Sequence, residues 1–268
     1  MSLSPVPAPP PPRPTDDDEE EESGIGGKMS FLEHLDELRQ RLIKALLAVL
    51  LGFVVALAFI NPIFEFVMTP LQAVLPAGGR LIYTEPTEAF MLYMKMAALV
   101  GLMIALPVVL WQVWAFIAPG LYAHEKRFAI PFVAMSTAFF IGGALFSHYV
   151  VFPAMWRFFA SFSTDTVEFA PRIEPVFSLY VRMALGLGAV FEMPTLVMFL
   201  ARVGMVTPRF LIRNTKYAIL IIFVVAALVT PSPDVVSQFL LALPMFVLYG
   251  FSIFVAWVFQ KRKPATAE

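Results

Sequence analysis

The chain contains 268 residues, of which 59% are hydrophobic, 15% are charged and none is cysteine. A soluble domain of this size cannot bury so much apolar surface, so the composition excludes a soluble or disordered protein and indicates an integral membrane protein. The absence of cysteine excludes disulfides and thiol catalysis, and a net charge of −1 offers no basic field for nucleic acid.

The first 28 residues differ in composition from the rest of the chain. Seven prolines fall within residues 1–14, and an unbroken acidic run occupies residues 16–22. Such a segment buries too little apolar surface to order itself, so we expect a disordered cytoplasmic tail over residues 1–28. The acidic run either stays solvated or mimics or repels the charges of a partner. Residues 29–268 are predicted to form one membrane domain with a short cytoplasmic C-terminus.

A predicted amphipathic helix begins at Ser30, which has capping-box spacing to Glu33. Leucines at helical intervals give this helix an apolar stripe, with charged residues on the opposite face. Arg39 and Arg41 suit anchoring at the membrane surface. Glu37 does not, because a carboxylate near an anionic membrane surface requires either water or a cation.

Long uncharged runs predict six transmembrane helices and an all-α fold. Twenty uncharged residues separate Lys44 from Glu65, and 29 separate Lys95 from Glu125. A helix needs about 20 apolar residues to cross the hydrocarbon core. The predicted spans lie near residues 40–60, 88–113, 128–153, 177–201, 214–230 and 235–258, with the fifth unusually short.

The distribution of Lys and Arg predicts the orientation. Six spans place both termini on one side, and this side carries 14 of the 19 basic residues. The positive-inside rule therefore predicts that both termini are cytoplasmic.

Three polar features interrupt the apolar pattern. Residues 111–127 contain two tryptophans and a tyrosine suited to the headgroup zone, a Pro119-Gly120 turn, and Glu125 at the start of the third span. Alone, Glu125 has neighbouring cations with which to pair. Glu192 lies within the fourth span, where it either accepts a buried hydrogen bond or has a function. Asp234 either caps the sixth span or contacts a partner.

Six motifs resemble the TatC family, the polytopic core of the twin-arginine protein translocase. They occur in family order and cover essentially all of residues 29–258. The motifs are HLDELRQRL (34–42), QVWAFIAP (112–119), LYAHEKR (121–127), VVFP (150–153), FEMP (191–194) and TPSPDVVSQ (230–238).

The resemblance implies a receptor in the cytoplasmic (inner) membrane of a prokaryote that reads the Arg-Arg pair of a signal peptide. With TatA, TatB and further copies of itself, such a protein exports folded proteins by using the proton motive force, without a cofactor. The resemblance assigns Glu37 and Glu125 as the carboxylates that bind the two guanidinium groups. The same surface includes four further candidates: Arg39, Phe116, Pro119 and Leu121.

The resemblance also implies a cupped helix bundle with sites for the single-span subunits. Glu192 would be a polar point on its concave face, and the fifth and sixth spans would dock TatA and TatB. This docking makes Thr230, Asp234 and Gln238 candidate contacts. Pro70 matches a functionally important family position, and the sequence places it in the first extracytoplasmic loop.

The sequence contains no phosphate-binding GxxxxGK[ST] loop and no HExxH metal motif, and its three histidines lack metal-ligand spacing. We therefore predict a non-enzyme. Two rival classes remain: a secondary transporter with Glu192 as its ion site, and a membrane scaffold with no ligand of its own.

Overall fold

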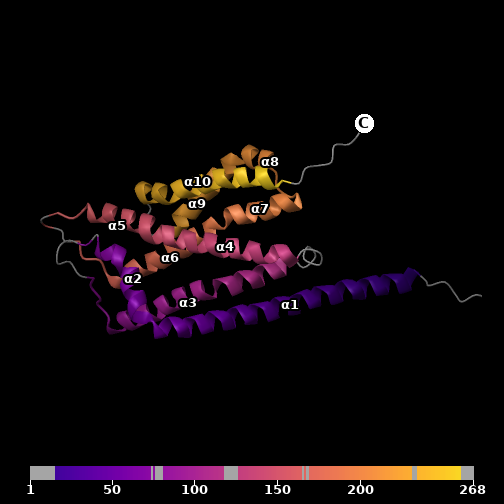
Figure 1. The fold of residues 1–268 in the computed structure, drawn as a ribbon, viewed down its shortest axis with the longest axis horizontal. Coiled ribbons are helices and arrows are strands. Elements are labelled where there is room, and N and C mark those ends of the chain that lie inside the picture. The colour runs from indigo at the N-terminus through magenta and orange to yellow at the C-terminus, as the bar shows by residue number, and fades with distance from the viewer. Residues whose placement is uncertain are drawn as a thin grey trace, which may run out of the picture.

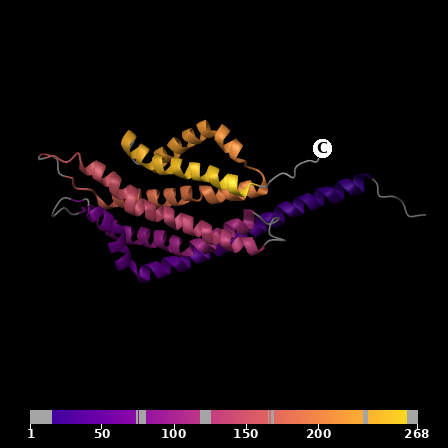
Figure 2. The same ribbon diagram turned by 45° about the horizontal axis from the view of Figure 1, so that its top comes forward.

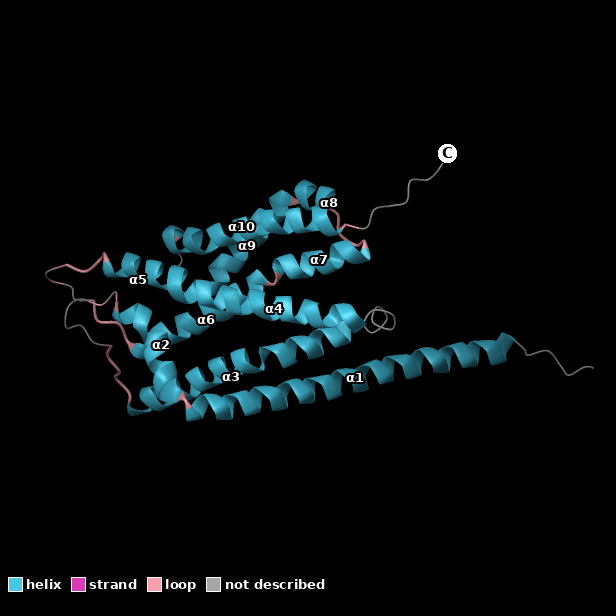
Figure 3. Cartoon of the chain, viewed as in Figure 1, coloured by secondary structure: helices cyan, strands magenta, loops and turns pink. Residues whose placement is uncertain are grey.

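The protein is described here from a computed structural model of residues 1–268. The structure describes residues 16–73, 75, 81–117, 126–164, 166, 169–230 and 234–260. Within these residues the chain is helical apart from short connections (Figure 3). The predicted all-α class is therefore confirmed.

Long helices account for five of the six predicted spans. Alone or joined end to end, they form continuous apolar stretches of 25 to 31 residues. The remaining one, the fifth in chain order, is the 15-residue helix α9, and its short uncharged run predicted this. In chain order the helices of the spans are α1 (Asp16–Ala58), α3 (Pro86–Ile117), α4 (Lys126–Phe146) with η1 (Ser147–Val151) and α5 (Phe152–Ala160), α6 (Ile173–Phe191) with α7 (Met193–Val203), α9 (Thr215–Val229) and α10 (Val235–Phe259).

Two short helices were not predicted from the sequence. α2 (Ile60–Gln72) follows α1 after a single non-helical residue, and α8 (Pro208–Arg213) precedes α9. Pro70 lies inside α2 and is buried with Val67, Met68 and Leu71. The prediction of Pro70 in a loop was therefore wrong. Its ring is buried near the C-terminal end of the helix, where it removes one backbone hydrogen bond to the preceding turn.

The predicted start of the first helix was also wrong. α1 begins at Asp16, within the acidic run, and not at Ser30. Acidic residues are favourable in the first turns of a helix because they complement the positive end of its dipole. Residues 1–15 lie outside the described residues.

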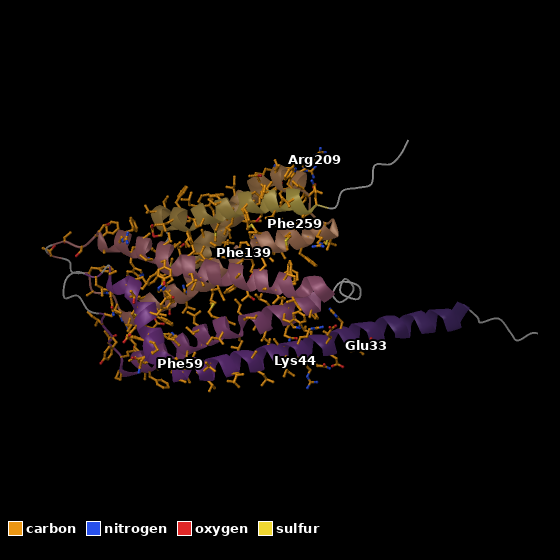
Figure 4. The ribbon with its side chains drawn as sticks, in the orientation of Figure 1. Glu33, Lys44, Phe59, Phe139, Arg209 and Phe259 are labelled. Carbon is orange, nitrogen blue, oxygen red and sulfur yellow. The ribbon has the colours of Figure 1, made fainter. Side chains whose placement is uncertain are left out.

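The helices form one elongated bundle (Figures 1 and 2). α1 begins, α3 ends and α10 ends at the same end of the bundle, on the right in Figure 1, which we call the terminus end. α2, the start of α3 and the start of α6 lie at the opposite end. Figure 4 marks the two ends: Glu33 and Arg209 lie at the terminus end, and Phe59 lies at the opposite end.

The hydrophobic core lies towards the opposite end of the bundle. It is built mainly from α2, α3, α5, α6 and α10, with Phe152, Phe177 and Met183 among its fully buried side chains. By contrast, α1 exposes most of its leucines, as expected for a helix whose outer face meets lipid.

A polar clamp fixes the starts of α3 and α6 relative to each other. Ile173 donates a backbone hydrogen bond to Ile82 O at 2.9 Å, and Arg172 donates to the carboxylate of Glu88, which is 7% exposed. The hydrogen bond to Glu88 raises the pKa of Arg172 above its ordinary value, because the carboxylate stabilises the charged guanidinium. The two helices therefore start at the same level and run in the same direction.

Candidate functional site

The candidate site at the terminus end begins with Glu37 on α1. Its side chain is 33% exposed, and its Oε1 accepts hydrogen bonds from Nε and Nη2 of Arg41, with the Nε contact at 2.9 Å. His34 Nδ1 lies 3.8 Å from Oε2. The carboxylate is thus held on its own helix by residues one turn away on either side.

The pairing of Glu37 with Arg41 is weak enough to be exchanged. Ion pairs of this i,i+4 type on a helix surface contribute about 0.3–0.5 kcal/mol. A bidentate guanidinium from a ligand, in a partly dry site, gains about 1.5–3 kcal/mol per charged hydrogen bond. The Glu37–Arg41 pair therefore holds the carboxylate in place at little energetic cost to its exchange.

An aromatic contact joins α1 to the end of α3. The rings of His34 and Phe116 stack, with centroids 4.4 Å apart and planes 15° apart. Phe116 is half-buried and is the next-to-last residue of α3. The structure therefore brings Glu37 and Phe116, two residues predicted for the same surface, together through His34.

The close approach of α1 and α3 depends on two glycines. A Cβ at Gly52 would lie 2.3 Å from Gly101 O, and a Cβ at Gly101 would lie 2.5 Å from Phe53 N. Glu37 precedes Gly52 by fifteen residues and Phe116 follows Gly101 by fifteen. Because the helices are antiparallel, both residues lie about 22 Å from the crossing, at the same level.

The remaining predicted members of this surface are only partly placed. Arg39 is exposed on α1, about 200° around the helix from Glu37, and so lies on a different side. Pro119, Leu121 and Glu125 lie outside the described residues. His34 belongs to this surface but was not predicted. The sequence shows its helical spacing to Glu37, but it does not show that His34 packs against Phe116 of α3.

Glu192 lies at a break in the fourth span, between α6 and α7. It accepts a hydrogen bond from Ser136 Oγ of α4, which agrees with the structural alternative for this residue. Its other oxygen is buried without a partner among the described residues. The same is true of the hydroxyls of Thr137 and Thr195. Pro194 contributes to the break because it has no N–H to continue the helix.

The other polar candidates make local structural contacts. Asp234 Oδ1 accepts from the backbone N–H of Ser237 at 2.6 Å, so it does cap α10. Gln238 Nε2 donates to Phe223 O at 3.0 Å and ties α10 to α9, while Thr230 Oγ1 donates to Ala226 O. None of these bonds involves Glu37 or Phe116. In the described part of the chain, no cluster of metal-ligating side chains occurs.

Comparison with known proteins decides the family. The family described as Sec-independent protein translocase protein (TatC) matches residues 33–244. The chain belongs to the TatC family. The Sec-independent protein translocase protein TatC of Desulforapulum autotrophicum is 44% identical over 241 residues, which are 90% of this chain and 89% of that one.

Two solved structures extend the similarity to the fold. A crystal structure of the twin-arginine translocase receptor TatC has a TM-score of 0.73 and 36% identity, covering 84% of this chain and 98% of that chain. A second, of the same receptor in DDM, has a TM-score of 0.75 and 36% identity, covering 83% and 99%. The predicted TatC resemblance is confirmed.

Membership establishes the class of the protein. It is a multi-pass prokaryotic membrane protein of a translocase family and not an enzyme. The break at Glu192 lies in the FEMP motif, and the Asp234 cap lies in TPSPDVVSQ, so two of the motifs that carried the resemblance coincide with interruptions in the helices.

Proposed function

We propose that this protein is the signal-peptide receptor of a twin-arginine translocase, with Glu37 and Glu125 binding the two arginines of the signal peptide. The observation that carries the proposal is the Glu37 carboxylate, which is partly exposed, oriented by its own helix and bonded to a guanidinium. A site that already accepts Arg41 has the geometry needed for an arginine of a ligand. Phe116 and His34 supply an aromatic wall beside it.

The two carboxylates select the ligand but do not supply all of the binding energy. Two charged contacts contribute roughly 3–6 kcal/mol, whereas micromolar affinity needs about 8 kcal/mol. The apolar segment that follows the arginines in a signal peptide supplies the rest by burial, at about 25 cal/mol per Å². Arg39, Pro119 and Leu121 complete the proposed recognition surface.

This function requires the terminus end to be cytoplasmic. The excess of Lys and Arg at this end supports that orientation, because positively charged residues are retained on the cytoplasmic side. In the proposed orientation, α2 and the polar clamp between Arg172 and Glu88 face the other side of the membrane.

The proposed function is tested by the binding of purified protein to signal peptides that differ only at the arginine pair. We expect an Arg-Arg peptide to bind at least tenfold more tightly than a Lys-Lys peptide, because Lys cannot form the bidentate contact with a carboxylate. Equal binding of the two peptides would favour the scaffold or transporter alternatives and contradict the receptor.

We further propose that the broken fourth span and the α9–α10 end contact the single-span subunits TatA and TatB. The buried, incompletely bonded polar atoms around Glu192 support this role, since an extra hydrogen-bonding partner there relieves an unfavourable burial. Thr230, Asp234 and Gln238 remain candidates for partner contacts, and Pro70 remains a candidate functional position. Transport of folded proteins in this assembly would draw on the proton motive force.

Replacing Glu192 by alanine is expected to reduce TatA recruitment several-fold while leaving signal-peptide binding unchanged. The replacement removes the hydrogen-bond acceptor of Ser136 from the fourth span but touches nothing at the terminus end. The measurement is crosslinking of TatA to the purified receptor, with Ser136→Ala as the matched variant that removes the hydrogen bond but keeps the carboxylate. Unaltered TatA crosslinking in Glu192→Ala would contradict this assignment.

A further inference from the structure

An open groove lies between α3 and α6, away from the candidate peptide-binding site. Its volume is about 430 Å³, which is within the range of small-molecule sites. The groove is lined by Lys95, Ala98, Leu99, Leu102, Ser178, Val181, Arg182 and Leu185. Its lining therefore combines two cations with a mainly apolar wall.

The two cations lie at the same depth. Lys95 is nine residues beyond the first residue of α3, and Arg182 is nine residues beyond the first residue of α6. The backbone contact between Ile82 and Ile173 sets the starts of these helices side by side. Both side chains therefore attach about 14 Å along their helices from the opposite end of the bundle.

The charges in the groove do not balance. Lys95 Nζ donates to Glu174 Oε1 at 2.9 Å, and Ser178 Oγ donates to the same oxygen. Among the described residues, no carboxylate lies within ion-pair distance of Arg182, which is exposed in the groove. Of the two cations that line the groove, only Lys95 is paired with a carboxylate, so the groove has a surplus positive charge.

A surplus positive charge inside a membrane span requires compensation. Placing an arginine at the centre of a transmembrane helix costs about 2.5–3.5 kcal/mol on insertion scales. Long basic side chains reduce this cost by extending towards the headgroups. An anion at the level that the Arg182 guanidinium reaches would remove this energetic cost more completely.

The apolar part of the lining lies deeper in the membrane than the charges. Leu99 and Leu102 follow Lys95 by one and two helical turns, and Leu185 follows Arg182 by nearly one turn. Seen from the opposite end of the bundle, the groove therefore presents cations first and hydrocarbon next. A phospholipid in the adjoining leaflet has this order: its phosphate lies outside its acyl chains.

We propose that this groove is a binding site for one anionic phospholipid from the leaflet at the opposite end of the bundle. The fork of Arg182 donates to the phosphate, Lys95 contributes a second charge, and an acyl chain lies along Leu99, Leu102 and Leu185. A transmembrane helix from another protein is about 10 Å wide and rarely carries an anion at this depth, so it matches the groove less well.

The test is native mass spectrometry of the detergent-purified protein titrated with phosphatidylglycerol or phosphatidylcholine of identical acyl chains. We expect one tightly held phosphatidylglycerol per chain, with phosphatidylcholine bound at least tenfold more weakly. Arg182→Ala should lower phosphatidylglycerol occupancy at least tenfold, whereas Arg182→Lys retains most of it. Arg209→Ala, which removes an exposed arginine from α8 at the other end, is the matched control and should behave like the wild type.

A second variant tests the groove without altering its charge. Leu102→Trp fills the apolar part of the groove, so we expect this variant to lose the bound lipid. Its unfolding temperature in the absence of lipid should equal that of the wild type, which shows that the variant is folded. Excess inorganic phosphate should not displace the lipid, because free phosphate lacks the acyl chain. Equal occupancy in Arg182→Ala and the wild type, equal binding of the two lipids, or displacement by inorganic phosphate would overturn the proposal.

Discussion

Replacing Glu37 by alanine is expected to weaken the binding of a twin-arginine signal peptide by about 10- to 100-fold. This range corresponds to the loss of one charged hydrogen-bonding contact of about 1.5–3 kcal/mol. The effect is enlarged because Arg41 loses its partner and then repels the arginines of the peptide. The measurement is the equilibrium binding of a labelled signal peptide to the purified protein.

Two further variants separate the causes of this loss. Asp36→Ala removes the same charge from the preceding position on α1, about 100° around the helix, and should bind the peptide normally. The double variant Glu37→Ala/Arg41→Ala removes the repulsion and should recover part of the affinity. If Glu37→Ala bound as well as the wild type while Asp36→Ala was impaired, the assignment of Glu37 would be wrong. Glu125→Ala is expected to weaken binding as well.

Introducing a side chain at Gly52 or Gly101 is expected to separate α1 from α3 and to destabilise the protein strongly. The alanine Cβ at either position would meet backbone atoms at 2.3 to 2.5 Å, which rotamer changes cannot relieve. Overpacking in a tight contact costs about 1–3 kcal/mol, and a backbone clash lies at or above the top of this range. The measurement is the unfolding temperature in detergent.

The matched control is Gly142→Ala, where an added Cβ meets nothing within 4 Å. This variant should be neutral or slightly stabilising, because alanine favours the helix over glycine. A second readout reports the geometry directly. Since the chain has no cysteine, His34→Cys/Phe116→Cys introduces the only thiols, whose crosslinking should fall in the Gly101→Ala background. Unchanged stability and crosslinking would show that the glycine contact does not hold the two helices together.

The membrane spans were predictable because their signal is local. Uncharged runs of sufficient length have few alternatives to a transmembrane helix, and all six predicted spans correspond to helices in the structure. α2 was missed because Glu65 and several polar residues interrupt its apolar pattern. The cap at Asp234 was one of two stated alternatives, because capping depends only on neighbouring residues.

Contacts between spans were not predictable from one sequence. Nothing in the spacing of Gly52 indicates that Gly101 crosses it, and nothing pairs His34 with Phe116. Glu37 was predicted through its motif, and its pairing with Arg41 follows from the i,i+4 spacing. The groove was hidden for the same reason. Lys95 and Arg182 lie within two of the predicted spans, but neither span's sequence indicates that the two side chains line one groove.

Site-specific photocrosslinking tests the receptor proposal most directly. A photoreactive phenylalanine analogue at position 116 differs little from the native Phe116 side chain and lies beside His34. We expect it to crosslink to the peptide next to the arginine pair, and we expect the same analogue at Phe59, at the opposite end of the bundle, to give no such product (Figure 4). A bound peptide that crosslinks at Phe59 but not at Phe116 would contradict the proposed site.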